Sequence, residues 1–390
     1  MLPRIRFPSF NGHYTEKSLH EAVLELKSGL SRMFSDSDIG LPVIRSNNIK
    51  DYCLDFNELK YWFEEDTQGA TTSNYYLRDG DILVNFINSQ AQIGKSAIYY
   101  NALNRDCIYT TNILSLRINK DYSPEFIFFF FQTKMYNDYI QSITKPAVNQ
   151  ASFTTKDFRK MKIFFPNLTE QTKIANFLSS VDEKIALLNK QYDLLCRYKK
   201  GMMQKIFSQE VRFKDEYGED FPVWNHKILG DICRIRTGKL DANAMVAGGK
   251  YRFYTCAREF YQIDEYAFDT EALLISGNGA NVGYIHYYSG KFNAYQRTYV
   301  LDGFNHNIAY VKYFLDMYLN ERIYGEKKEG NTPYIVMGTL ADMQIKLPII
   351  KEQTKIANFL SALDDKIAVT KAELDKLKTW KQGMLQQMFV

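Results

Sequence analysis

The chain has 390 residues, with 49 basic and 45 acidic side chains and a formal net charge of +4 at neutral pH. This length is sufficient for two domains with separate hydrophobic cores. The near balance of charge does not by itself indicate nucleic-acid binding, so any anion-binding surface must be local.

Cysteine and histidine spacing argues against a disulfide framework and a metal centre. The five cysteines are scattered and odd in number, which fits reduced thiols in a cytoplasm. None of the five histidines has the spacing of a metal site. The N-terminus lacks an apolar segment of signal-peptide length, and no stretch approaches the roughly 18 apolar residues of a membrane span. We therefore expect a cytoplasmic protein without a metal or another cofactor.

The first half of the chain, residues 1–166, is predicted to form a mixed α/β domain. A polar entry is followed by stretches with the alternation typical of strands. A helical stretch near residues 124–143 contains the apolar run 126–131, which we interpret as core. The half then returns to a short strand that ends at Pro166, where proline disfavours helix in the residue before it. The expected strands cover residues 42–49, 80–86, 93–100 and 112–116.

The second half, residues 209–348, repeats this order. A helical stretch near residues 306–324 precedes a short strand that ends at Pro348, 182 residues after Pro166. The expected strands cover residues 251–255, 272–277, 282–288 and 299–301. Residues of the two polar entries also match, Arg6 with Arg212 and Tyr14 with Trp224. The chain is therefore expected to have two similar domains.

Each half is followed by a copy of one segment, residues 167–208 and 349–390. The stretches 170–179 and 352–361 are identical, and apolar residues then recur at alternating steps of four and three. This spacing predicts a coiled-coil helix of roughly 55 Å in each copy, at about 1.5 Å per residue. Lys199 and Lys381 interrupt the two apolar seams at the same place.

The distance between the two copies indicates a pseudo-symmetric chain. Two helices with narrow apolar stripes can bury those stripes most simply against each other. The alternative is a pair of core helices within one globular domain.

Three motifs could indicate an enzyme, and each has a simpler interpretation. The glycine-rich stretch 277–283 precedes an expected strand, so we interpret it as a turn instead of a dinucleotide-binding loop. Residues 331–334 resemble the Asn-Pro-Pro-Tyr signature of adenine methyltransferases, but the second residue differs and no glycine-rich cofactor site accompanies them. The charged triplets 182–184 and 364–366 lie on the coiled-coil helices, where charges solvate a face or pair across chains. We expect no catalytic residues.

Polar residues in loops are the remaining candidates for a binding site. Arginine and lysine match guanine acceptors and phosphates, and asparagine and glutamine can pair with adenine. The same residue types are common in ordinary turns, so the pattern permits base reading without requiring it. The first-half candidates are Arg45, Ser46, Asn47, Asn48, Lys50, Asn88, Gln90, Gln92, Lys95, Asn149 and Gln150. The second-half candidates are Lys239, Arg258, Asn278, Asn281, Gln296, Arg297, Asn331 and Thr332.

The duplicated Pro-x-x-x-Glu-Gln-x-Lys-Ile-Ala-x-Phe-Leu segments, at 166–178 and 348–360, resemble the specificity subunit of type I restriction–modification systems. The stretches 42–45 and 253–256 and the loop 278–283 before 296–299 extend the resemblance over essentially the whole chain. It implies an α+β fold. Two pseudo-symmetric mixed α/β DNA-recognition domains would be separated by two long helices that pair as an antiparallel coiled coil.

The resemblance also implies a function without catalysis. Target-recognition domain 1 (residues 1–166) and target-recognition domain 2 (209–348) would each read one half of a bipartite double-stranded DNA target. The central helix (167–208) and the C-terminal helix (349–390) would set the spacing and dock methyltransferase subunits, and restriction subunits that translocate DNA would join this assembly. Two alternatives stay open, a coiled-coil scaffold that does not bind DNA and a DNA methyltransferase with its own cofactor.

Overall fold

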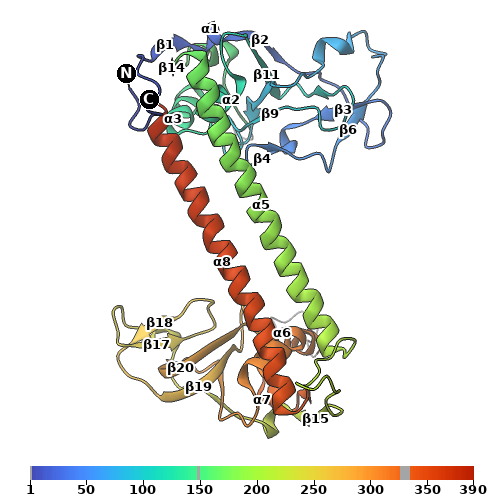
Figure 1. Cartoon of the computed structure of the whole chain (residues 1–390), viewed down its shortest axis with the longest axis vertical. Helices are drawn as coiled ribbons and strands as arrows, with labels where there is room; N and C mark the ends of the chain where they lie inside the picture. Colours follow the sequence, from blue (N-terminus) through green and yellow to red (C-terminus); the bar gives the residue numbers. More distant parts are fainter. Residues whose placement is uncertain (1, 147–149, 326–333) are drawn as a thin grey trace. The chain divides into compact units, whose positions relative to one another are not determined.

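A computed structural model describes residues 2–146, 150–325 and 334–390. The chain divides into two compact units (Figure 1). Unit 1 comprises Met1–Asn189 with Glu373–Val390, and unit 2 comprises Lys190–Ala372. Each unit therefore contains one globular domain together with a segment of each long helix. Within these described ranges, no helix combines the length and the apolar character needed to cross a bilayer.

Unit 1 is built on a four-stranded sheet with the order β2-β11-β7-β9. One face of the sheet packs on α2, whose phenylalanines are buried as predicted. The other face packs beneath a smaller sheet with the order β10-β3-β6. The main strands are β2 (Val23–Ser28), β3 (Leu41–Ile44), β6 (Lys60–Trp62), β7 (Ile82–Asn85), β9 (Ser96–Ile98), β10 (Ile108–Tyr109) and β11 (Ile113–Ile118).

The rest of unit 1 contains small sheets of short strands. Strand β1 (Thr15–Ser18) pairs with β14 (Lys162–Phe165), and β4 (Ile49–Lys50) pairs with β5 (Cys53–Leu54). A third small sheet has the order β12-β13-β8, with β12 (Lys145–Pro146), β13 (Ala151–Ser152) and β8 (Ile87–Asn88). The helices are α1 (Leu19–Ala22), α2 (Pro124–Phe130), α3 (Lys134–Ile143) and α4 (Thr155–Arg159).

The helical stretch expected near residues 124–143 is confirmed but divided in two. Ser123 caps α2 and Pro124 occupies its first turn, where a missing backbone N–H costs nothing. The hydroxyl of Thr133 accepts a hydrogen bond from the Tyr136 N–H and so begins a new helix, α3. The division follows from this second cap.

Unit 2 contains a six-stranded sheet with the order β16-β21-β19-β20-β17-β18. Its main core lies between this sheet, α6 and the ends of the two long helices. The strands are β16 (Arg234–Thr237), β17 (Tyr251–Tyr254), β18 (Tyr261–Ile263), β19 (Phe268–Ser276), β20 (Ile285–Ala294) and β21 (Thr298–Asp302). A separate pair joins β15 (Asn225–Ile228) to β22 (Gln344–Leu347), and the remaining shorter helices are α6 (Ile308–Gly325) and α7 (Met337–Ala341).

The strands expected from alternation are confirmed in both halves, although several are shorter than predicted. The equivalent strands β2 and β16 were missed. Their alternation is weak because Leu24 of β2 is exposed and β16 places arginine at two of its four positions. A short strand with a charged outer face carries little apolar signal.

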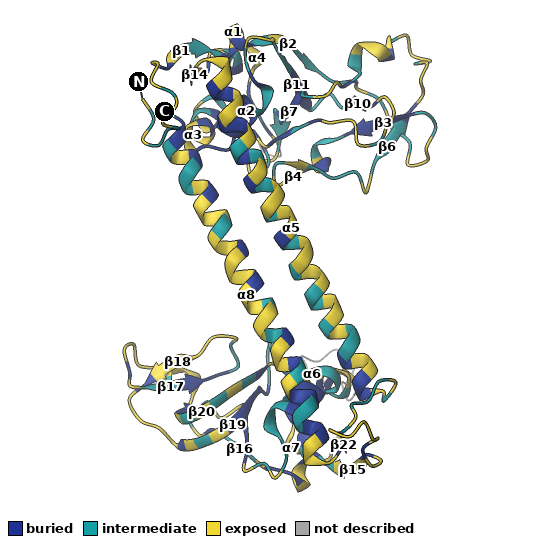
Figure 2. Ribbon diagram, in the orientation of Figure 1, coloured by how far each residue is buried: buried dark blue, intermediate teal, exposed yellow. Residues whose placement is uncertain are grey.

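Both predicted long helices are confirmed as α5 (Leu168–Phe207) and α8 (Ile350–Met388). Buried residues recur along each helix between exposed ones, as expected for a narrow seam (Figure 2). In unit 1 the ion pairs Asp182–Lys381 and Lys184–Glu373 join the two helices, so rising residue numbers in α5 meet falling numbers in α8. In unit 2 the Lys199–Asp364 ion pair and the contact of Lys371 with the Tyr192 ring show the same direction. The helix segments in each unit are therefore antiparallel, as the resemblance implied.

The two lysines that interrupt the seams pair with carboxylates of the opposite helix. Lys381 lies 2.6 Å from Asp182 and donates to Gln132 of unit 1. Lys199 pairs with Asp364, which also accepts a hydrogen bond from the Tyr313 hydroxyl at 2.7 Å. The lysine of each helix copy therefore pairs with the aspartate of the other copy. The first aspartate of each charged triplet, Asp182 or Asp364, therefore serves helix pairing within this one chain.

The duplicated Glu-Gln motif joins each globular domain to its helix. Glu170 is fully buried and accepts hydrogen bonds from Arg6 at 2.6 and 2.7 Å and from Tyr14 at 3.1 Å. Glu352 is equally buried and accepts from Arg212 at 2.7 and 3.2 Å and from Trp224 at 3.0 Å. The predicted matches of Arg6 with Arg212 and of Tyr14 with Trp224 are thus confirmed by shared roles.

The glutamine of the motif acts beside this buried carboxylate. In unit 1, Gln171 donates to the Pro166 carbonyl at 2.9 Å and accepts from the Ser123 N–H at 3.0 Å. In unit 2, Gln353 donates to Pro348 at 2.7 Å and accepts from the Asn307 N–H at 3.0 Å. Each glutamine therefore connects the start of a long helix to the start of a domain helix.

Replacement of Arg212 by alanine tests this anchor. It leaves Glu352 buried without its cation, and removing one partner of a buried pair costs about 3 kcal/mol of unfolding free energy. The matched control is Lys205→Ala, because the Lys205–Glu210 pair is exposed on both sides and should contribute less than about 1 kcal/mol. Urea denaturation followed by circular dichroism measures both losses. Equal losses in the two variants would contradict the anchoring role.

Candidate nucleic-acid interface

Four loops of unit 2 converge at one end of the six-stranded sheet. Thr237 ends β16 opposite Tyr299, and Ser276 ends β19 opposite Thr298. The carbonyl of Arg297 accepts from the Gly277 N–H at 2.9 Å and from the Cys256 thiol at 3.4 Å. We call the loops 238–241, 255–258, 277–283 and 295–298 the unit 2 loop edge. It brings together the predicted residues Lys239, Arg258, Asn278, Asn281, Gln296 and Arg297.

The close approach of these loops requires glycine at two positions. A Cβ atom at Gly238 would lie 1.8 Å from the Ala294 carbonyl oxygen, and one at Gly277 would lie 2.4 Å from the Arg297 carbonyl oxygen. Both distances are far below contact between real atoms. Glycine is used here because it lets two backbones approach closely.

A polar pocket of about 310 Å³ opens at the unit 2 loop edge. Its lining comes from Gly277, Gln296, Arg297, Tyr299 and Ile335. The hydroxyl of Tyr299 donates to the Ile335 carbonyl at 2.8 Å, which fixes one wall. The pocket therefore lies beside two of the predicted binding residues.

The polar side chains of this edge differ in their freedom. Asn281 donates to the Cys256 carbonyl at 3.1 Å and accepts from Arg258 at 3.4 Å, so it holds two loops together. Gln296 donates to Asp241 at 2.8 Å. Lys239 and Arg297 are exposed, and no carboxylate of the described ranges pairs with either cation. These two cations are the most available for an anionic ligand.

The predicted residues of unit 1 also come together. The side chain of Asn85, at the end of β7, donates to the Ser46 carbonyl at 3.5 Å. The sheet β12-β13-β8 then joins residues 145–146 and 151–152 to residues 87–88. We call the stretches 45–50, 86–95, 145–146 and 150–152 the unit 1 loop edge. It holds Arg45, Ser46, Asn47, Asn48, Lys50, Asn88, Gln90, Gln92, Lys95 and Gln150.

Some of these unit 1 side chains are occupied by internal contacts. Asn48 is 3% exposed, accepts from the Arg45 N–H at 2.9 Å and donates to the Asp55 carbonyl at 2.9 Å. Lys50 pairs with Asp55 at 2.7 Å, and Gln90 donates to Gln141 at 2.8 Å. Asn48 therefore supports the loop from inside. Asn47, Lys95 and Gln150 are exposed.

Three of the predicted DNA-binding residues fall in stretches for which the structure gives no description. Asn149, Asn331 and Thr332 lie outside the residues that the structure describes. The same holds for most of the methyltransferase-like stretch 331–334, of which the described residue is Tyr334.

The two loop edges contain the same turn with different side chains. In unit 1 the Gly94 N–H donates to the Asn85 carbonyl at 2.7 Å, and in unit 2 the Gly283 N–H donates to the Ser276 carbonyl at 2.8 Å. Gly94 and Gly283 have φ angles of 78° and 82°, a region that favours glycine. Because a strand follows each turn, the interpretation of residues 277–283 as a turn is confirmed.

Sequence reasoning missed Tyr284 and Asp241 at the unit 2 loop edge. The guanidinium of Arg258 lies 5.5 Å from the centre of the Tyr284 ring, an arrangement that orients a cation over an aromatic face. Asp241 orients Gln296. The sequence could have pointed to these residues only by their position, since Asp241 ends one glycine-containing loop and Tyr284 directly follows another.

These features define the class of the protein. It is a pseudo-symmetric α/β chain whose two units share one helix motif and carry two polar loop edges of common design. The family model described as the type I restriction modification DNA specificity domain matches residues 38–196 and again 223–379. The chain belongs to this family.

Named relatives carry the same description. The chain is 41% identical over 167 residues to the type I restriction enzyme EcoDI specificity subunit of Escherichia coli. This aligned region covers 42% of this chain and 37% of that protein. It is 29% identical over 393 residues to the putative MjaX specificity subunit of Methanocaldococcus jannaschii, covering 95% and 91%. The chain thus matches about a third of the EcoDI subunit and most of the MjaX subunit.

Solved structures share the fold. A type I restriction–modification S subunit from M. genitalium matches with a TM-score of 0.68 and 16% identity, covering 100% of this chain and 99% of that one. A chain from a study of assembly and conformational transition of the type I system matches with a TM-score of 0.53 and 16% identity, covering 99% of each. At such identity the likeness concerns the fold.

His286, behind the unit 2 loop edge, provides a pH test. Burial lowers the pKa of His286, and its Nε2–H donates to the Ala257 carbonyl at 3.0 Å. As pH falls below about 6.5, His286 therefore binds a proton more readily in the unfolded chain than in the folded one. Protonation of this histidine thus lowers the free energy of unfolding in acid. We predict that His286→Gln reduces the loss of unfolding free energy between pH 7 and pH 5. The exposed His226→Gln is the control, and an unchanged pH slope in His286→Gln would contradict the prediction.

Proposed function

We propose that this chain is the non-catalytic DNA specificity subunit of a type I restriction–modification complex in the cytoplasm. Target-recognition domain 1, residues 1–166, and target-recognition domain 2, residues 209–348, each read one half of a bipartite double-stranded target. The observation that carries the proposal is the shared turn at the two loop edges, 89–94 and 278–283, because one backbone frame presents two different sets of side chains. Two unlike readers specify two unlike half-sites.

The chemistry of each loop edge supports base reading. Exposed Arg297 and Lys239 have the donors that match guanine or phosphate acceptors, and Gln296 and Asn278 have the amides that match adenine. Each good bidentate pair contributes about 1–3 kcal/mol of discrimination against a wrong base. Arg258 is held by Asn281 and Tyr284, so its guanidinium is oriented before DNA arrives.

The two helices, 167–208 and 349–390, set the spacing between the readers and dock methyltransferase subunits. Large apolar side chains are exposed at matched positions of α5 and α8, which supports repeated docking of one kind of partner. These matched pairs are Leu168 with Ile350, Leu187 with Val369 and Tyr198 with Trp380. Restriction subunits join this assembly.

Exchange of residues 30–150 for the same region of another family member tests the division of labour. The chain is produced with its cognate methyltransferase subunits, and methylated adenines are located by genome sequencing with and without the gene. We expect one half-site to change and the other half-site and the gap to stay the same, because the second reader is untouched.

The reciprocal exchange of residues 238–300 is the matched control and should change only the other half-site. Unchanged specificity in both exchanges would contradict the proposal and would favour a scaffold that does not read DNA. Methylation by the chain alone, without the partner subunits, would instead favour a methyltransferase.

A further inference from the structure

One face of the unit 2 sheet carries arginines over a cluster of aromatic rings. Leu273 and Ile275 of β19 point into the main core beside α6, whereas Ala272 and Leu274 belong to a small cluster on the opposite face. That cluster also contains the buried rings of Tyr254, Phe268 and Phe292. We call this side the arginine–aromatic face and define it by Arg236, Arg252, Arg258, Tyr254, Phe268 and Tyr288.

Each of the three arginines lies over an aromatic ring, Arg236 and Arg252 over rings of this face and Arg258 over the neighbouring Tyr284. The guanidinium carbon of Arg236 is 5.0 Å from the centre of Phe268, and that of Arg252 is 4.5 Å from Tyr288 and 4.3 Å from Phe260. A guanidinium stacked on a ring keeps its planar N–H donors at the edge, where they can reach an anion.

Ring contacts make this face continuous with the unit 2 loop edge. Arg258 lies over Tyr284, and the centre of Tyr284 is 4.8 Å from that of His286. His286 is 5.0 Å from Tyr254, which is 5.8 Å from Tyr288 beneath Arg252. The face therefore begins at Arg258, already proposed to meet DNA, and extends along the sheet away from the unit 2 loop edge.

The charge on the face is predominantly positive. Asp302 is the buried acid of this side, and it pairs with both Arg234 and Arg236. Arg252 and Arg258 have no carboxylate partner within the described parts of the chain. Glu259 lies close enough to act on His286, but no ion pair joins it to either arginine. The face thus has two arginines without a carboxylate partner, Arg252 and Arg258, beside one aspartate that is shared by two further arginines.

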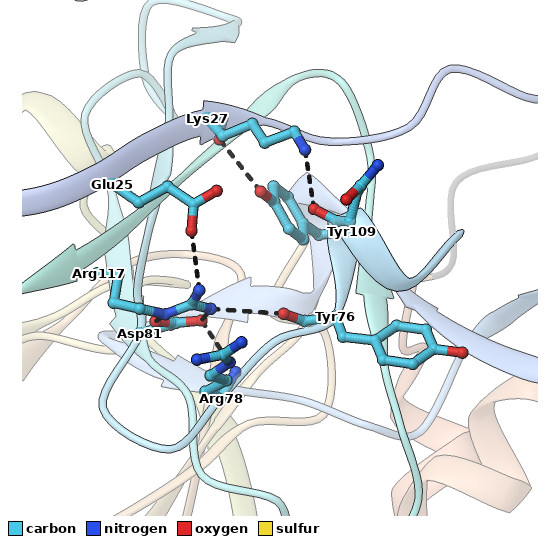
Figure 3. A network of polar contacts seen from close by, with 8 residues as sticks. Glu25, Lys27, Tyr76, Arg78, Asp81, Tyr109 and Arg117 are labelled. Carbon is cyan, nitrogen blue, oxygen red and sulfur yellow. Dashed lines mark hydrogen bonds and ion pairs between the residues drawn. The ribbon is translucent and has the colours of Figure 1, made fainter. Parts of the chain in front are cut away.

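Unit 1 has the opposite arrangement at the equivalent place. Arg117 of β11 faces Glu25 of β2, where Asp302 of β21 faces Arg234 of β16. Arg117 pairs with Glu25 at 2.8 Å and with Asp81 at 2.6 Å (Figure 3). Lys27 donates to the Asn74 carbonyl at 2.9 Å and lies over the Tyr75 ring, 4.5 Å from its centre. At this place unit 1 therefore pairs one arginine with two carboxylates, whereas unit 2 pairs two arginines with one carboxylate.

We propose that the arginine–aromatic face of unit 2 binds phosphates of the duplex that flanks the unit 2 half-site. This inference rests on the proposed function, because it assigns a second contact to the same reader. Continuity with the loop edge, charge of the right sign and guanidinium geometry suited to phosphate favour this ligand over an acidic segment of a protein. The complex then holds DNA asymmetrically, with a longer footprint beyond the unit 2 half-site than beyond the unit 1 half-site.

The test measures how salt weakens binding of the assembled complex, the full chain with its cognate methyltransferase subunits, to a labelled duplex carrying the bipartite target. Arg252→Gln should reduce the slope of log affinity against log salt by about 0.9 for the one lost phosphate contact. The loss should be the same for every target sequence, and the methylated motif should stay unchanged. Arg252→Lys keeps the charge and should restore most of the slope.

Two comparisons make the test specific. Lys27→Gln in unit 1 is the matched control and should leave the slope unchanged. With the wild-type chain, trimming the duplex beyond the unit 2 half-site should lower affinity more than an equal trim beyond the unit 1 half-site. This second comparison needs no variant, so it decides the question even if Arg252→Gln fails to fold.

The outcomes separate this inference from the proposed function. Sequence-specific binding with an unchanged slope and equal effects of the two trims overturns the inference alone. Loss of methyltransferase subunits from Arg252→Gln, without a change in slope, also overturns it and assigns the face to an acidic protein partner. Failure of the wild-type complex to distinguish its target from scrambled DNA overturns the proposed function itself.

Discussion

The fold depends on a buried carboxylate that is used twice. Glu170 and Glu352 are each withdrawn from water at the start of a long helix, where an isolated charge would be strongly destabilising. Each is acceptable because an arginine from the preceding polar entry supplies two hydrogen bonds and an aromatic N–H or O–H supplies a third. The direction of each helix is therefore fixed relative to its own domain. This requirement explains why the helix motif is nearly invariant between two halves whose loops differ.

The same logic of paired charges continues along the helices. Lys199 and Lys381 would be unfavourable in an apolar seam, and each is compensated by an aspartate of the opposite copy. A polar group at a seam position specifies register at some cost in stability. Here each pair also reaches a globular domain, through Tyr313 or Gln132. Helix pairing and domain position are thus coupled within each unit, which suits a protein proposed to hold a reader at a defined place.

Much of the architecture could be predicted from the sequence because it follows from repetition and periodicity. The long helices, most strands and the turn at 277–283 are of this kind. Side-chain partnership could not be predicted, since it depends on residues that only the fold brings together. Asn48 is among the predicted DNA-binding residues, yet its amide is engaged by Arg45 and Asp55. Of the arginine–aromatic face, the sequence pattern predicts Arg258 alone, because the other members come from separate strands. The DNA-binding set stays a prediction.

In the proposed function, the paired helices hold two independent readers at a fixed separation. One heptad inserted into both helices, after Asn189 and after Ala372, keeps the seam in phase and lengthens each helix by about 10 Å. That length corresponds to roughly three base pairs of B-form DNA. Genome-wide sequencing of methylated adenines should then show both half-sites unchanged and a gap longer by about this amount. An unchanged gap, or altered half-sites, would show that the helices do not set the spacing.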